Sequence, residues 1–137
     1  MSHHCSSALV RCMDFRLGPA IRDYLNEKNL YGHIDIISMA GGAKDLAQSD
    51  ESALEGQVDL SKRLHQIKTV ILINHTDCGG YGGHEAFGSL EEERAQLIGD
   101  MKNARDKLTS KYQDLEVKLV LAIIDEDAGV KIEEIEG

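Results

Sequence analysis

The sequence lacks any hydrophobic run long enough to cross a membrane, which takes about 20 consecutive apolar residues. The N-terminal segment, residues 1–5, also lacks the basic region and following apolar stretch of a secretory signal peptide. Internal repeats, low-complexity tracts and long linkers are absent as well. These absences favour a globular protein of the cytoplasm.

Positive charge and cysteine are both scarce. The chain has 15 Lys and Arg residues against 24 Asp and Glu residues, which gives a formal net charge of −9. Because no basic stripe is present to neutralise phosphates, we expect neither nucleic acid nor an anionic membrane as a partner. The three cysteines are an odd number, and their spacing indicates no disulfide framework. Thiols in the cytoplasm stay reduced and are free to bind a metal.

The remaining composition is typical of one soluble globular unit. The chain has 137 residues, of which 42% are hydrophobic and 28% are charged. A chain of this length buries roughly two-thirds of its unfolded surface when it folds. We therefore expect a single domain over residues 1–137, with residues 1–6 flexible.

Short apolar segments alternate with longer amphipathic segments along the chain. The run at 69–74 is continuous and β-branched, as is typical of a central strand that is buried on both faces. Further strands are expected at 8–12, 34–38, 117–124 and 131–135, and helices at about 18–30, 52–66 and 89–108. The stretch at 45–51 is interpreted as a mobile surface segment. This alternation predicts an α/β fold with a mostly parallel sheet and helices on both faces.

Two short clusters carry groups that bind metals. Cys12 ends the first expected strand, and His75 and Cys78 follow the third. In open parallel sheets, ligands bind beyond the carboxyl ends of strands, at the point where the strand order reverses. Two Cys and one His form a known ligand set of catalytic zinc, which leaves the fourth position for water or substrate. The alternative interpretation is two buried structural thiols and a hydrogen-bonded core histidine.

A carboxylate and a guanidinium lie directly after the first thiol. Residues two apart on an extended segment share a face, so Asp14 is expected to pair with Arg16 and to stay ionised. Asp14 would then be either a fourth metal ligand or the acceptor of a hydrogen bond from metal-bound water. Zinc lowers the pKa of such water to about 7, which provides a hydroxide nucleophile at neutral pH. An ordinary structural ion pair is the alternative.

The combination of Cys12-x-Asp14-x-Arg16 with His75-x-x-Cys78 resembles the β-class carbonic anhydrase family. The Ala40-Gly41-Gly42 segment resembles that family's Ala-Gly turn, and the chain from Val120 to Ile132 resembles its last strand and hairpin. The resemblance covers roughly residues 7–135 and describes a short, divergent member. Either metal motif alone would be weak, whereas the two together are specific.

The resemblance implies a fold, a metal and a reaction. The fold is a sheet of order 2-1-3-4 with an antiparallel edge strand. The metal is Zn²⁺ on Cys12, His75 and Cys78, and the reaction is reversible hydration of carbon dioxide to bicarbonate, with Asp14 and Arg16 as the catalytic pair. The resemblance also implies a homodimer or a higher homo-oligomer.

Three positions depart from the family pattern. Phe15 stands where the family usually has a small hydroxyl residue, and Ser38 and Met39 stand where it often has Arg and Asn. These departures keep two alternatives open, namely a non-catalytic zinc protein of the same fold and a hydrolase of carbon disulfide or carbonyl sulfide. Redox chemistry through Cys12 and Cys78 is a further alternative, although they form no Cys-x-x-Cys motif.

The glycine-rich loops and one histidine complete the candidate site. The loops match neither a dinucleotide-binding fingerprint nor a P-loop, so no nucleotide cofactor is expected. The backbone N–H groups of Gly41, Gly42 and Gly79 are predicted to hold a bicarbonate oxygen. His84 is a candidate proton shuttle because the ordinary pKa of histidine is near 6.5, and a solvated loop histidine is the alternative.

Overall fold

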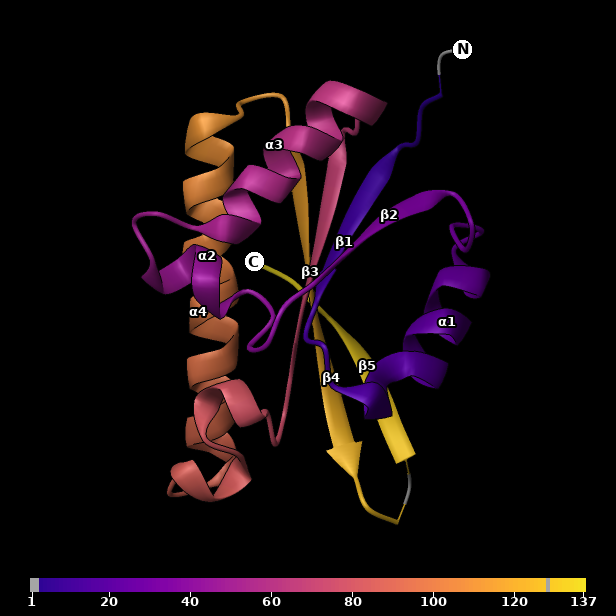
Figure 1. Cartoon of the computed structure of the whole chain (residues 1–137). Coiled ribbons are helices and arrows are strands. Elements are labelled where there is room, and N and C mark those ends of the chain that lie inside the picture. Colours follow the sequence, from indigo (N-terminus) through magenta and orange to yellow (C-terminus); the bar gives the residue numbers. More distant parts are fainter. Residues whose placement is uncertain (1–2, 128) are drawn as a thin grey trace.

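The computed structural model describes residues 3–127 and 129–137, and it has a five-stranded sheet flanked by helices (Figure 1). The strands are β1 (Ser7–Arg11), β2 (Ile34–Ser38), β3 (Thr69–His75), β4 (Glu116–Asp125) and β5 (Gly129–Ile135). The helices are α1 (Gly18–Glu27), α2 (Lys44–Gln48), α3 (Ala53–His65) and α4 (Leu90–Lys111). Three short 3-10 turns are η1 (Phe15–Leu17), η2 (Gly79–Tyr81) and η3 (His84–Ala86).

The strand order confirms the predicted sheet. The order is β2-β1-β3-β4-β5, the first four strands are parallel, and β5 is antiparallel to β4. The chain therefore leaves β1 towards β2 on one side and later returns to form β3 on the other side. The carboxyl ends of β1 and β3 therefore lie at the point of reversal, where open parallel sheets bind ligands.

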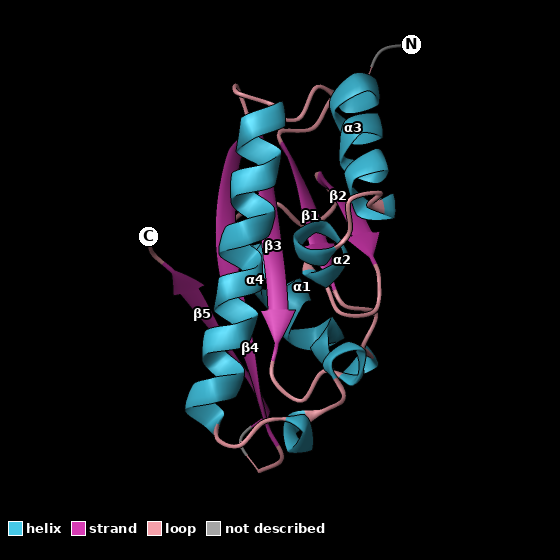
Figure 2. Cartoon of the chain, turned by 90° about the vertical axis from the view of Figure 1, so that its left-hand side faces the viewer, coloured by secondary structure: helices cyan, strands magenta, loops and turns pink. Residues whose placement is uncertain are grey.

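Helices cover both faces of the sheet, as the alternating pattern predicted. Figures 1 and 2 show α1 on one face and α2, α3 and α4 together on the other. Along β3, Val70 and Leu72 belong to the core beneath α2–α4, while Ile71 and Ile73 belong to the core beneath α1. Because β3 is buried on both faces, a continuous apolar run is what its position requires.

The prediction of a mobile segment at 45–51 is wrong for its first part. Residues 44–48 form α2, whose Leu46 is only 2% exposed in the core against α4. The pattern was too short to show helical periodicity, so its single buried leucine went unrecognised.

The long helix begins as its sequence predicted. The Ser89 hydroxyl accepts a hydrogen bond from the backbone N–H of Glu92 at 3.1 Å, and the Glu92 carboxylate accepts one from the N–H of Gly88. The two contacts satisfy backbone donors at the helix start.

None of the described helices, α4 included, has a stretch apolar enough to cross a bilayer. Of the N-terminal segment expected to be flexible, residues 1–2 lie outside the described residues, and its flexibility stays a prediction.

Two glycine turns, which follow the carboxyl ends of β2 and β3, pack directly against each other. A Cβ atom on Gly80 would lie 2.7 Å from the backbone N and Cα of Gly41, whereas one on Gly79 would meet no atom within 4 Å. We expect Gly80→Ala to lower the free energy of unfolding by about 1–3 kcal/mol, as overpacking does. Gly79→Ala is the matched control and should change it by less than about 0.5 kcal/mol. Urea denaturation of both variants checks this, and equal losses would contradict the close packing.

Candidate metal centre

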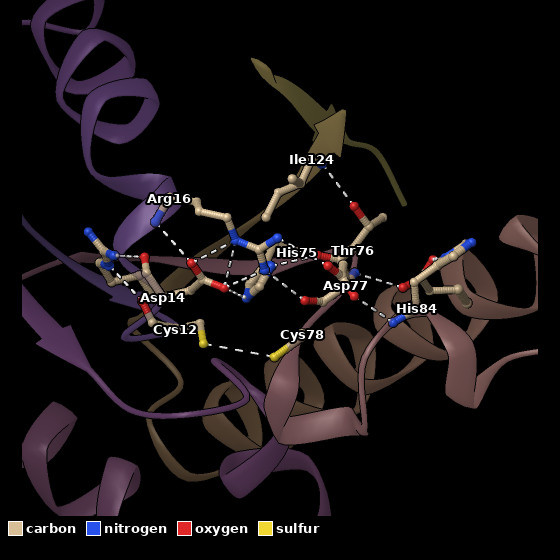
Figure 3. A network of polar contacts seen from close by, with 11 residues as sticks. Cys12, Asp14, Arg16, His75, Thr76, Asp77, Cys78, His84 and Ile124 are labelled. Carbon is tan, nitrogen blue, oxygen red and sulfur yellow. Dashed lines mark hydrogen bonds and ion pairs between the residues drawn. The ribbon is translucent and has the colours of Figure 1, made fainter. Parts of the chain in front are cut away.

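Three buried ligand-type side chains meet at the carboxyl ends of β1 and β3. Cys12 follows β1, His75 ends β3, and Cys78 lies three residues further on, directly before η2. One donor atom from each lies within 4.8 Å of the other two. Figure 3 shows the two sulfur atoms facing each other beside the His75 ring. The strand-end placement inferred from the sequence therefore does bring these three side chains together.

The hydrogen bonding of His75 leaves one ring nitrogen available to a metal. Nδ1 lies 2.7 Å from the carbonyl oxygen of Thr76, and because a carbonyl can only accept, Nδ1 carries the proton. Nε2 of the neutral ring then has a free lone pair. Among the buried side-chain nitrogen and oxygen atoms of the described residues, His75 Nε2 alone has no hydrogen-bond partner. An unpartnered acceptor at the thiols is what a metal ligand requires before the ion binds.

The two thiols are arranged to share one proton. Their sulfur atoms are 3.8 Å apart, so the S–H of Cys78 can donate to the sulfur of Cys12. This contact lowers the pKa of Cys12 and raises that of Cys78. The backbone N–H of Gly41 also favours the thiolate form of both residues. Since the thiolate is the form that binds metal, the pair suits a divalent cation, and the residues present fit zinc.

Asp14 and Arg16 form a close ion pair beside the thiols. The Asp14 carboxylate accepts hydrogen bonds from the backbone N–H, Nε and Nη2 of Arg16, the last at 2.7 Å. These contacts lower the pKa of Asp14 to about 2. The pairing was predicted on an extended segment, but Asp14 instead caps the η1 turn. Asp14 Oδ2 lies 4.0 Å from His75 Nε2, so the carboxylate borders the three-residue cluster without belonging to it.

Sequence reasoning missed two acidic residues that hold this arrangement. Asp77 accepts hydrogen bonds from Arg16 at its side chain and at its carbonyl oxygen, both at 3.0 Å. Glu93 is fully buried and accepts a hydrogen bond from the Asp77 N–H at 2.8 Å. The spacing of Glu93 to Leu97 could have revealed it, because residues four apart share one face of a helix. Nothing in the sequence singled out Asp77 except that it lies within the His75-x-x-Cys78 motif.

His84 lies at the edge of this network rather than at the metal ligands. Its Nδ1 donates to Glu93 Oε1 at 2.7 Å, and its backbone N–H donates to Asp77. The Glu93 carboxylate raises the pKa of His84 above its ordinary value. His84 and Arg16 both line a cavity of about 650 Å³. A titratable imidazole thus shares a solvent-connected cavity with the guanidinium beside the cluster.

The glycine loops pack tightly around the cluster. Gly42 has a φ of +57°, and a Cβ atom there would lie 2.6 Å from the carbonyl oxygen of Ile73. The neighbouring Asn74 side chain accepts from the N–H of Ala43 and donates to the carbonyl oxygen of Leu97, each at 2.9 Å. The turn is thereby fixed against the end of β3. The binding of an anion by Gly41, Gly42 and Gly79 stays a prediction.

Comparisons with known proteins agree with this architecture. A family model described as "Putative carbonic anhydrase" matches residues 2–133. Two relatives described as uncharacterized proteins come from Rickettsia conorii and Rickettsia bellii. They are 26% and 25% identical over 130 residues, which cover 90% of this chain and 70% and 79% of theirs.

Solved structures of similar fold share little sequence with this chain. The β-carbonic anhydrase CcaA superposes with a TM-score of 0.68 at 12% identity, covering 99% of this chain and 79% of that one. A tetrameric β-carbonic anhydrase from the filamentous ascomycete Sordaria macrospora gives a TM-score of 0.60 at 14% identity, covering 99% and 83%. At these identities the likeness establishes the fold alone.

Proposed function

Because this chain belongs to the carbonic anhydrase family whose model it matches over residues 2–133, we propose that it is a zinc-dependent lyase that reversibly hydrates carbon dioxide to bicarbonate. The observation that carries the proposal is the unpartnered Nε2 of His75 beside the Cys12 and Cys78 thiols. A buried acceptor without a donor is costly unless it serves a ligand. The ion pair next to it supplies a charged group for the reaction.

In this proposal the three clustered ligands hold the metal, and neighbouring residues orient the water and move the proton. Cys12, His75 and Cys78 would hold zinc, with the Nδ1–H of His75 fixed by Thr76 so that Nε2 faces the ion. Zinc, when bound, supplies the positive charge that turns water into a nucleophile near neutral pH. Three protein ligands would leave one coordination position for the reactants.

The Asp14 carboxylate would orient the attacking water. With the pKa of Asp14 held at about 2 by Arg16, Oδ2 is ionised at neutral pH and accepts hydrogen bonds without donating them. Oδ2 would therefore accept a hydrogen bond from the attacking water and hold that water in one orientation. Arg16 in turn is held by Asp77, which keeps the carboxylate from swinging into the cluster.

Proton release and anion binding are assigned to the rim of the site. His84 would take up protons and pass them to solvent, since it lines the same cavity as Arg16. The N–H groups of Gly41, Gly42 and Gly79 would hold a bicarbonate oxygen. Although Phe15 departs from the family pattern, it is 86% exposed, so its ring takes no space from the reactants.

We further infer a homo-oligomer, a homodimer or higher, in the cytoplasm. Phe15 and Met13 are both large, apolar and exposed next to the site, and burying them against a second copy would remove apolar surface from water. The Sordaria macrospora proteins of this fold are tetrameric. A reducing compartment would keep Cys12 and Cys78 as free thiols.

Stopped-flow measurement of carbon dioxide hydration on the zinc-loaded protein tests the proposed reaction. We expect the rate to exceed that of buffer in proportion to protein concentration. A rate equal to buffer, with zinc at the cluster confirmed by metal-edge diffraction, would overturn the enzyme and leave a non-catalytic zinc protein. Faster turnover of carbon disulfide or carbonyl sulfide would overturn the choice of substrate.

A further inference from the structure

A second group of metal-ligand side chains lies at the opposite end of the sheet. Cys5, Asp35 and His65 each offer a donor atom within 4.8 Å of the other two. Cys5 precedes β1 and Cys12 follows it, so the two clusters are separated by roughly 20 Å at about 3.3 Å per strand residue. The second cluster is therefore independent of the proposed reaction.

Three separate elements bring these side chains together. Asp35 is the second residue of β2 and pairs in register with Ala8 of β1, while His65 is the last residue of α3. The backbone N–H of Cys5 donates to the carbonyl oxygen of His65 at 3.2 Å, which fixes the thiol beside the imidazole. The arrangement is thus held by the backbone as well as by the side chains.

The donor set is suited to a transition metal. His65 Nδ1 lies 2.7 Å from Asp35 Oδ2, and the Ser61 hydroxyl donates to the same carboxylate at 2.5 Å. Sulfur, imidazole nitrogen and carboxylate oxygen are the three ligand types that zinc takes in proteins, at about 2.0–2.3 Å. Donor atoms around a tetrahedral ion with such bonds are roughly 3–4 Å apart. The Asp35–His65 contact, now 2.7 Å, would open to that spacing, and the three donor atoms already lie within 4.8 Å of one another.

Further imidazoles surround the cluster and can supply a fourth ligand. The His3 ring lies edge-on to the His65 ring, with 4.7 Å between the ring centres. A cavity of about 280 Å³ lies at this end of the sheet. Its ligand-type lining residues are His3, His4, Cys5, His33, Asp35 and His65. Cys5 is a free thiol, and the lining of this cavity includes no second cysteine with which it could form a disulfide.

We propose that Cys5, Asp35 and His65 form a second metal site for zinc or a similar divalent transition ion, completed by His3 or His4. On binding, the Cys5 thiol gives up its proton to solvent and its sulfur coordinates the ion. As the contact with Asp35 opens, the proton of His65 Nδ1 moves through solvent to Nε2, which leaves the Nδ1 lone pair for the ion. The ion fastens the N-terminal segment to β2 and to the end of α3. Its role is structural, because an ion that binds the folded chain and not the unfolded chain stabilises the fold, by an amount that grows with the free zinc concentration.

Zinc content of the protein, dialysed against buffered free zinc, tests the site. The Cys5→Ser variant should hold one zinc equivalent fewer than the parent protein, lose the rise in unfolding temperature that zinc gives through this site, and keep its hydration rate. The Cys78→Ser variant is the matched control and should lose the other equivalent. Equal zinc content in Cys5→Ser and the parent would overturn the proposal.

Two further measurements do not depend on how the Cys5→Ser variant folds. In the parent protein, zinc should protect Cys5 from alkylation by iodoacetamide, as read by mass spectrometry of the labelled peptide. In a His3→Gln/His4→Gln variant, whose changes are confined to the N-terminal segment, zinc affinity at this site should fall at least about tenfold. Unprotected Cys5 at saturating zinc, or unchanged zinc affinity in the double variant, would refute the site as proposed.

Discussion

Replacing Cys78 with serine should remove zinc from the Cys12 cluster and reduce carbon dioxide hydration to the rate of buffer. Serine keeps the size of the side chain but offers a hydroxyl in place of a thiolate, and zinc at such sites favours sulfur and imidazole. Changes to residues that merely orient a ligand weaken metal binding about 10–100-fold, so loss of a ligand itself should weaken it by more than about 100-fold. Dialysis followed by metal analysis checks the affinity.

Spectroscopy separates a lost ligand from a lost fold. Loaded with cobalt in place of zinc, the parent protein should show sulfur-to-metal charge-transfer absorption, and Cys78→Ser should lose the part of it that comes from the Cys12 cluster. Circular dichroism should stay unchanged because the side-chain volume is kept. A Cys78→Ser protein with full zinc affinity at the cluster and full activity would remove Cys78 from the ligand set.

Replacing Asp14 with asparagine should separate the chemistry from metal binding. The amide keeps the shape of the carboxylate but can donate as well as accept, so it no longer enforces one orientation of water. We expect kcat/KM for hydration to fall about 100- to 10,000-fold, the usual worth of a positioned proton acceptor. Zinc content should be unchanged because Asp14 is outside the three-residue cluster. The pKa of Asp14 at about 2 makes the loss equal across the neutral and alkaline range.

Glu133→Gln is the matched control for the Asp14 substitution. Glu133 also pairs with an arginine, because its carboxylate accepts a hydrogen bond from Nη1 of Arg94 at 2.8 Å. It lies on β5, away from the cluster. Its neutralisation should leave hydration unchanged. If Asp14→Asn retains full turnover, the Asp14–Arg16 contact is only a structural ion pair. If it loses zinc as well, Asp14 is a metal ligand and the proposed division of roles is wrong.

The sequence predicts that distant residues lie close together where the geometry of parallel strands alone determines their positions. Cys12 and His75 are far apart in the chain, but parallel strands end at the same edge, so their proximity follows from strand assignment. The Asp14–Arg16 pair was also expected, although it forms across a capped turn instead of along a strand. A prediction that two nearby residues pair can thus be correct even where the predicted backbone conformation is not.

Residues whose role depends on packing could not be predicted in the same way. Glu93 is one of three consecutive acidic residues in the first turn of α4, yet it is fully buried and contacts Asp77 and His84. The buried Leu46 of α2 and the gathering of Cys5, Asp35 and His65 likewise depend on how helices dock against the sheet. Periodicity in one segment carries no information about such contacts between elements.

The side chain of Asn74 makes the metal site sensitive to changes far from it. Asn74 bonds to the Ala43 N–H and to a carbonyl oxygen in the middle of α4, and the next residue along the strand is His75. A displacement of α4 would therefore pull on the backbone one residue from a metal ligand. Substitutions on the remote side of that helix can tune how tightly the ion is held, so the affinity of the centre can evolve while its ligands remain constant.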